Sequence, residues 1–194
     1  MIQLIAQPWW VNLLILVPLA VYFSWRSSRV PVGLRQLISS GVFAAAFGVL
    51  EAVVVVYLRA AAGMLPGYQG TLAHFRSPGE LHQSYDDITQ IPQTLLTLEG
   101  FREAATILML LSVAFLSSGI PRVQTAVFLW AFAIWDIVYY AALWATIRWP
   151  LAITDPDVLF LIPVPWLSPV WFPLLVSGLV IAAVLLTRRT QTRA

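Results

Sequence analysis

The chain has 194 residues, of which 60% are hydrophobic, and its formal net charge is only +2. Its mean hydropathy of +0.82 excludes an ordinary soluble domain and indicates a multi-pass helical membrane protein. Cysteine is absent and all 11 basic residues are arginine, which excludes disulfides, thiolate metal sites, P-loop lysines and Schiff-base lysines.

The apolar stretches predict an all-α fold, a single integral membrane domain (1–194) with about five transmembrane helices. We expect the spans at about 9–25, 37–62, 94–117, 123–147 and 170–186. The polar segment 63–92 is predicted to be an extracytoplasmic loop. Segment 148–169 is rich in proline and aromatic residues, and its apolar part is too short to cross a bilayer. We therefore expect it to lie in the outer interface or to re-enter the membrane, shielded by protein.

Arginine placement predicts the orientation. With five spans, seven arginines and no acid fall on one side: Arg26, Arg29, Arg35, Arg122, Arg188, Arg189 and Arg193. This asymmetry indicates an N-terminus outside and a cytoplasmic C-terminus. The first span lacks a signal-peptide pattern, so we expect it to be retained. The use of arginine alone, with abundant alanine, leucine and valine, favours a bacterial cytoplasmic (inner) membrane.

Four acids fall inside the predicted spans. Glu51 lies in the second span, Glu99 and Glu103 lie one turn apart in the third, and Asp136 lies in the fourth. Arg102 is their nearest countercharge and can reach Glu99 at a spacing of three residues. A charged residue at a helix centre costs about 2.5 to 3.5 kcal/mol of insertion free energy, so these side chains must be paired, protonated or bound to a cation.

Counting about 1.5 Å per residue from the outer helix ends places Glu51, Glu103 and Asp136 about 14 to 18 Å deep, with Glu99 nearer the surface. Three helices thus bring acids to similar depths, and one arginine does not balance them. Intramembrane ionisable residues are typical of functional sites. The sequence therefore predicts an outward-facing carboxylate cluster in which Arg102 tunes the charge.

The outer loop offers a further pair of ligating side chains. His82 and Asp86 share a helix face at a spacing of four residues, in a segment that leads into the third span. With Glu51, Glu99, Glu103 and Asp136, His82 completes a predicted metal site, with Asp86, Tyr139 and Tyr140 in supporting positions. Carboxylates and one imidazole suit a divalent metal such as Fe, Mn or Zn. No motif indicates heme, a nucleotide or nucleic-acid binding.

Three functions remain open from the sequence. The leading hypothesis is cation or metal binding at the cluster, for transport, proton transfer or membrane metal chemistry. The alternative is a non-catalytic accessory or scaffold subunit of a larger membrane complex, whose charges are structural ion pairs. A membrane enzyme that uses the acids as general acid and base is the third. Expected partners are the lipid bilayer and further membrane subunits or a second copy of the chain.

One helix face is expected to pack closely. Ser40, Ala44 and Gly48 recur at four-residue spacing, which is typical of a small-residue face that allows close helix approach. Glu51 lies on the same face. We therefore expect this face, and Glu51 with it, to be buried against another helix.

Overall fold

The computed structural model describes residues 5–61 and 93–189. The 3₁₀ segment η1 (Trp9–Ile15) leads into α1 (Leu16–Trp25), and the longer helices follow as α2 (Leu34–Ala61), α4 (Gln93–Ser117), α5 (Pro121–Ile147) and α6 (Trp171–Thr187). Within the described residues, three helices are long and apolar enough to cross a membrane. The prediction of a helical membrane bundle is therefore confirmed at this level.

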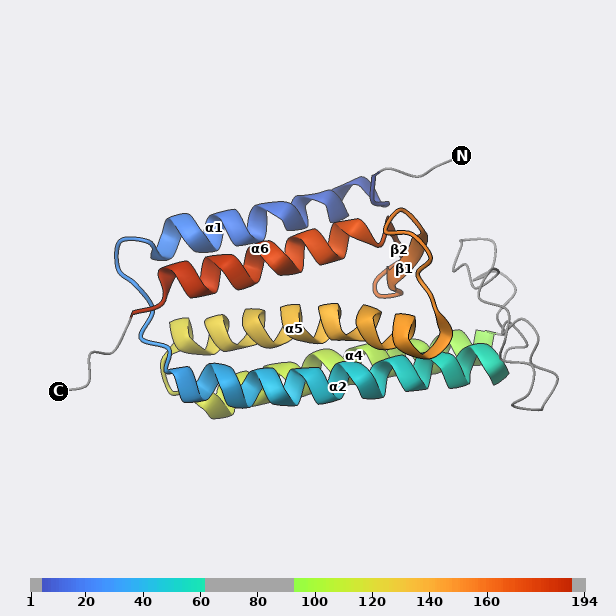
Figure 1. The fold of residues 1–194 in the computed structure, drawn as a ribbon, viewed down its shortest axis with the longest axis horizontal. Coiled ribbons are helices and arrows are strands. Elements are labelled where there is room, and N and C mark those ends of the chain that lie inside the picture. Colours follow the sequence, from blue (N-terminus) through green and yellow to red (C-terminus); the bar gives the residue numbers. More distant parts are fainter. Residues whose placement is uncertain (1–4, 62–92, 190–194) are drawn as a thin grey trace.

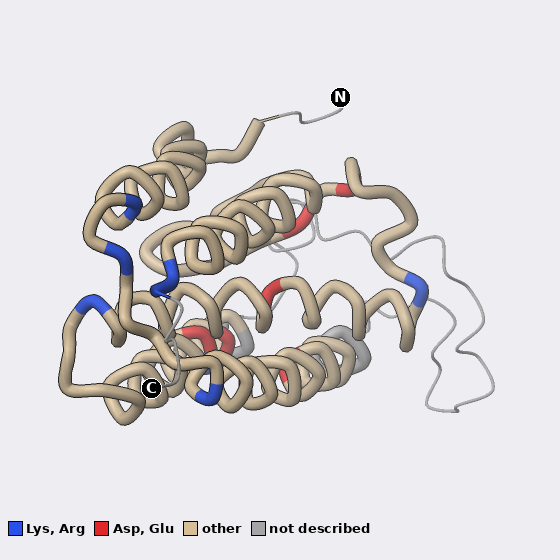
Figure 2. The backbone as a smooth tube through the Cα atoms, turned by 60° about the vertical axis from the view of Figure 1, so that its left-hand side comes forward, with Lys and Arg blue, Asp and Glu red and all other residues tan. Residues whose placement is uncertain are grey.

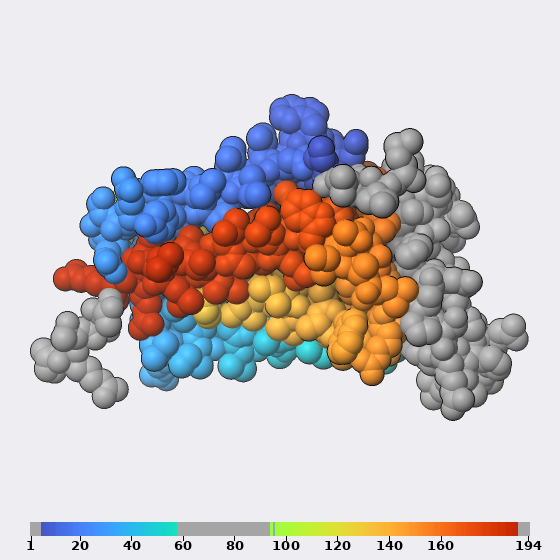
Figure 3. Space-filling model, turned by 45° about the horizontal axis from the view of Figure 1, so that its top comes forward, coloured from blue at the N-terminus to red at the C-terminus, as the bar shows by residue number. Residues whose placement is uncertain are grey.

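The helices form two layers (Figure 1). One layer holds α2, α4 and α5, with α2 and α4 both packed against α5. The other layer holds α1 and α6, and α6 contacts both α1 and α5. Figure 3 shows α6 exposed between α1 and α5 on one side of the molecule. Helix α5 thus lies at the centre of the bundle.

Helices α2 and α5 approach closely at Gly48. A Cβ atom placed on Gly48 would lie 2.7 Å from the backbone oxygen of Trp135 and 3.1 Å from the nitrogen of Tyr139. Ser40, Ala44 and Glu51 on the same face are also buried. The predicted small-residue face is confirmed, and its partner is α5.

One end of the bundle is rich in arginine (Figure 2). The α1–α2 connection is tied there to the end of α6, because the Val30 N–H donates to the carbonyl of Thr187 (2.9 Å) and the Arg189 N–H donates to the carbonyl of Val30 (2.8 Å). The Arg188 Nε also donates to the carbonyl of Val32. The two layers are thereby joined at this end.

The opposite end contains a β-hairpin that the all-α prediction missed. Strand β1 (Pro156–Phe160) pairs antiparallel with β2 (Trp166–Pro169), with an irregularity between Val158 and Phe160. Gln7 extends the pairing through hydrogen bonds with Leu167 in both directions, at 2.7 and 2.8 Å. These bonds satisfy backbone groups that a proline-rich segment cannot satisfy as a helix. Asp157 and Ser168 of the hairpin are almost fully buried, whereas Leu151, Ile153, Ile162 and Val164 of the same segment are exposed.

Candidate functional site

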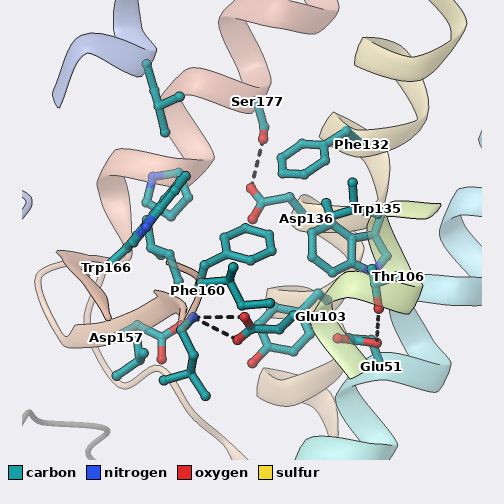
Figure 4. Close-up of a pocket in the computed structure, with 18 of the residues that line it drawn as sticks. Glu51, Glu103, Thr106, Phe132, Trp135, Asp136, Asp157, Phe160, Trp166 and Ser177 are labelled. Carbon is teal, nitrogen blue, oxygen red and sulfur yellow. Dashed lines mark hydrogen bonds between the residues drawn. The ribbon is translucent and has the colours of Figure 1, made fainter. Parts of the chain in front are cut away.

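A cavity of about 720 Å³ lies among α4, α5, α6 and the hairpin, with further wall residues from η1, α1 and α2. Protein interiors are close-packed and hold few voids larger than a water molecule, whereas small-molecule sites measure about 300 to 1,000 Å³. Most of the wall is apolar or aromatic, and the acids predicted from the sequence lie within it: Glu51, Glu99, Glu103 and Asp136. The cavity is therefore the candidate functional site (Figure 4).

Arg102 pairs with acids on two helices. Its Nε and Nη2 atoms donate to Glu99 Oε2 at 2.8 and 2.6 Å, and its Nη1 forms an ion pair with Glu51 of α2. Thr106 also lies near Glu51, with its hydroxyl 3.4 Å from Oε2. Two of the four acids predicted inside the spans thus share one guanidinium, which links α4 to α2.

Glu103 contacts the hairpin rather than another charge. The backbone N–H of Leu161 donates to both carboxylate oxygens of Glu103, at 3.0 and 2.8 Å. Leu161 immediately follows β1, and residues 158–162 line the cavity. Glu103 therefore holds the hairpin against α4 as one wall of the cavity (Figure 4).

Asp136 is the least compensated of these acids. It is only 8% exposed, and its Oδ2 accepts a hydrogen bond from the Ser177 hydroxyl of α6 at 2.8 Å. In the part of the chain that the structure describes, Ser177 is its one hydrogen-bond partner, and no cation lies within ion-pair distance. Asp136 thus presents a buried carboxylate to the cavity from the middle of α5.

A fifth acid, which the sequence placed only in the outer segment, also lines the cavity. Asp157 of β1 is 1% exposed, and its Oδ2 accepts a hydrogen bond from the Tyr140 hydroxyl at 2.8 Å. Tyr139 lines the cavity as well, and its ring stacks on Trp135 with centroids 6.2 Å apart. Tyr139 and Tyr140 therefore both line the cavity, and the Tyr140 hydroxyl is hydrogen-bonded to Asp157.

An aromatic cluster and Asp136 line the same cavity. The ring centroids of Phe132 and Trp135 are 5.3 Å apart, and Phe160 of the hairpin lies 6.3 Å from Phe132 and 6.4 Å from Trp135. Figure 4 shows the three residues and Asp136 in one view of the cavity wall. The buried Nε1 atoms of Trp135 and Trp166 have no hydrogen-bond partner among the described residues. Since buried donors are normally paired, these two indoles on the cavity wall are exceptions.

The structure brings together only part of the predicted metal site. Glu51, Glu99, Glu103 and Asp136 line one cavity, whereas His82 and Asp86 lie outside the described residues. Within residues 5–61 and 93–189, no group of three or more histidine or acidic side chains is placed to hold a metal ion. Metal ligation by these acids stays a prediction. In the structure the acids contact a guanidinium group, a backbone N–H group and hydroxyl groups.

Sequence reasoning missed three contributors to the site. Asp157, Phe160 and Ser177 reach the cavity from the hairpin and α6. Ser177 could have been identified as a candidate because it is a small hydroxyl side chain in an otherwise apolar helix. Nothing in the local sequence pattern indicates the hairpin that positions Asp157 and Phe160.

The chain was compared with protein-family models, curated proteins and solved structures, and none of them matches it.

Proposed function

We propose that this chain is a multi-pass membrane protein whose cavity binds a lipophilic small molecule. The observation that supports the proposal best is the cavity itself, an apolar space of about 720 Å³ with a few polar groups on its wall. Ligand sites combine this size with this kind of lining.

The polar groups on the wall favour a ligand with a polar head. Asp136 offers an acceptor that only Ser177 contacts among the described residues. The Nε1 atoms of Trp135 and Trp166 offer donors to an ether, carbonyl or hydroxyl oxygen. A molecule with a polar head and an apolar body would satisfy both sets of groups.

The membrane location assigned to this site is part of the proposal. Helices α2, α4 and α5 are long enough to cross, and we propose that the 17-residue helices Trp9–Trp25 and Trp171–Thr187 cross as well. Five spans place the arginine-rich end in the cytoplasm and the hairpin on the outer side. A bacterial cytoplasmic membrane is the proposed location.

The absence of cysteine gives a direct test of the topology. In single-cysteine variants, Ile5→Cys and Ala152→Cys should react with a membrane-impermeant maleimide from outside the cell. Ser28→Cys should be protected, and a reporter fused after Arg193 should be cytoplasmic. Equal labelling of Ile5→Cys and Ser28→Cys in intact cells would mean that α1 does not cross, which contradicts five spans.

The scaffold alternative is supported by one part of the site. The Glu51–Arg102–Glu99 cluster links two helices, and each of its three charged groups has an oppositely charged partner. We assign this cluster a structural role. Asp136 is not explained in the same way, since the described residues provide no cation for it.

Blocking the cavity should weaken binding. In detergent, the wild type should bind the neutral lipophilic dye N-phenyl-1-naphthylamine saturably. Val176→Trp places an indole in the cavity wall and should weaken binding about tenfold or more, which corresponds to about 1.4 kcal/mol. The matched control is Leu175→Trp, because Leu175 is exposed on the same helix and does not line the cavity. Fluorescence titration measures all three proteins.

Two outcomes would contradict the proposal. The first is dye binding that does not saturate, or that is the same in all three proteins. The second is a stoichiometric divalent metal in purified wild-type protein, combined with no cavity-dependent binding of the dye. The second outcome would favour the metal hypothesis instead.

A further inference from the structure

The charges around the cavity restrict the chemistry of its ligand. Five carboxylates line the wall against a single guanidinium: Glu51, Glu99, Glu103, Asp136 and Asp157, with Arg102. The guanidinium is already shared by Glu51 and Glu99. An anionic head group would therefore meet only like charges, and no cation of the described wall is free to bind it.

Asp136 differs from the other four acids in its contacts. Arg102 serves Glu51 and Glu99, the Leu161 N–H serves Glu103, and Asp157 has a further interaction besides its bond from the Tyr140 hydroxyl. Asp136 has only one neutral hydroxyl, on one of its two oxygens, although it is more than nine-tenths buried. A buried carboxylate without a countercharge is costly, and either protonation or a bound cation removes that cost.

The rings beside Asp136 favour the same kind of ligand. Phe132, Trp135 and Phe160 form a cluster with ring centroids 5.3 to 6.4 Å apart, and all three line the same cavity as this carboxylate. The faces of aromatic rings attract cations, and quaternary ammonium groups are bound in proteins by such groups of rings. A carboxylate within an aromatic cluster thus suits a bulky, weakly hydrated organic cation.

From these observations we infer that the ligand is a lipophilic organic cation, an amine or onium group on an apolar body, with its charge at Asp136 among Phe132, Trp135 and Phe160. This inference rests on the proposed function, because it names the ligand class of the same cavity. The apolar body would occupy the rest of the space, toward Leu14 and Val17 of the first helical segment.

Two ions of the same shape and opposite charge test the inference. Tetraphenylphosphonium and tetraphenylborate are titrated against wild-type protein carrying the bound dye. Tetraphenylphosphonium should displace the dye, whereas tetraphenylborate should not. Displacement by tetraphenylborate at equal or lower concentration would overturn the inference, while the binding of the neutral dye would keep the proposed function intact.

Three variants test where the positive charge of the ligand binds. Asp136→Asn keeps the shape of the side chain, so it should still bind the neutral dye but lose affinity for tetraphenylphosphonium about thirtyfold or more. Phe160→Leu should weaken the cation about three- to tenfold and change dye binding less. Asp155→Asn removes one negative charge outside the cavity and should leave both affinities unchanged.

Each remaining outcome decides between the two proposals. If Asp136→Asn binds the cation like the wild type, the charge is held elsewhere and the inference is wrong. If tetraphenylphosphonium fails to displace a dye that Val176→Trp excludes, the cavity binds neutral molecules and the inference is again wrong. If the wild type does not bind the dye at all, the proposed function fails, and the inference fails with it.

Discussion

Arg102→Ala should lower the free energy of unfolding by about 3 kcal/mol, the largest effect expected from a single substitution in this chain. Removing one partner of a buried ion pair leaves uncompensated charge and costs about 3 to 5 kcal/mol. The lower value applies because 22% of the Arg102 side chain remains exposed. The substitution leaves two acids, Glu51 and Glu99, without their cation. Unfolding in mixed micelles of increasing dodecyl sulfate content measures the change.

A matched variant separates lost charge pairing from lost packing. Arg102→Met combined with Glu51→Gln and Glu99→Gln removes all three charges while it keeps similar volumes. Replacing a buried ion cluster by neutral groups is often neutral or stabilising, so this triple variant should recover most of the lost stability. If Arg102→Ala is as stable as the wild type, the ion pairs of Arg102 with the two acids do not contribute to stability, which contradicts this account.

Gly48→Ala should be the next most harmful change, by about 1 to 3 kcal/mol, although alanine is the better helix former. The added Cβ atom would lie 2.7 Å from the carbonyl oxygen of Trp135, so α2 and α5 have to move apart. Gly178 is the control, because nothing lies within 4 Å of a Cβ atom placed there. Gly178→Ala should leave stability unchanged or raise it by up to about 1 kcal/mol.

The same pair of variants tests the link between this crossing and the site. Trp135 and Tyr139, whose backbone a Gly48 side chain would displace, both line the cavity. Dye affinity should therefore fall in Gly48→Ala and stay constant in Gly178→Ala. A Gly48→Ala protein with wild-type stability would show that the two helices are not in close contact at this residue.

The helices could be predicted because their signal is local. Long apolar runs ended by arginine, proline and glycine place the helix ends within three residues of the observed ones, apart from the two ends that border the undescribed residues 62–92. The burial of Glu51 could also be predicted from the sequence, because Glu51 lies on the same helix face as the small residues Ser40, Ala44 and Gly48. Both predictions depend on spacing along one helix.

The hairpin and its contacts could not be predicted because they depend on distant parts of the chain. Residues 156–169 show no clear alternation of apolar and polar side chains, and their pairing with Gln7 joins segments about 160 residues apart. Glu103 was predicted to be a metal ligand, but its partner is a backbone N–H, which every residue except proline carries. A sequence pattern cannot identify such a donor.

In the proposed topology, the ion pair between α2 and α4 has a consequence for biosynthesis. Helix α2 would insert with Glu51 before Arg102 is made, and the apolar length of α2 tolerates one acid. Helix α4 carries Glu99, Arg102 and Glu103 and is less apolar than α2 or α5. Glu51 would then be available to pair with Arg102 when α4 inserts. The proposed topology therefore implies that the least apolar of the long helices integrates with the help of an earlier one.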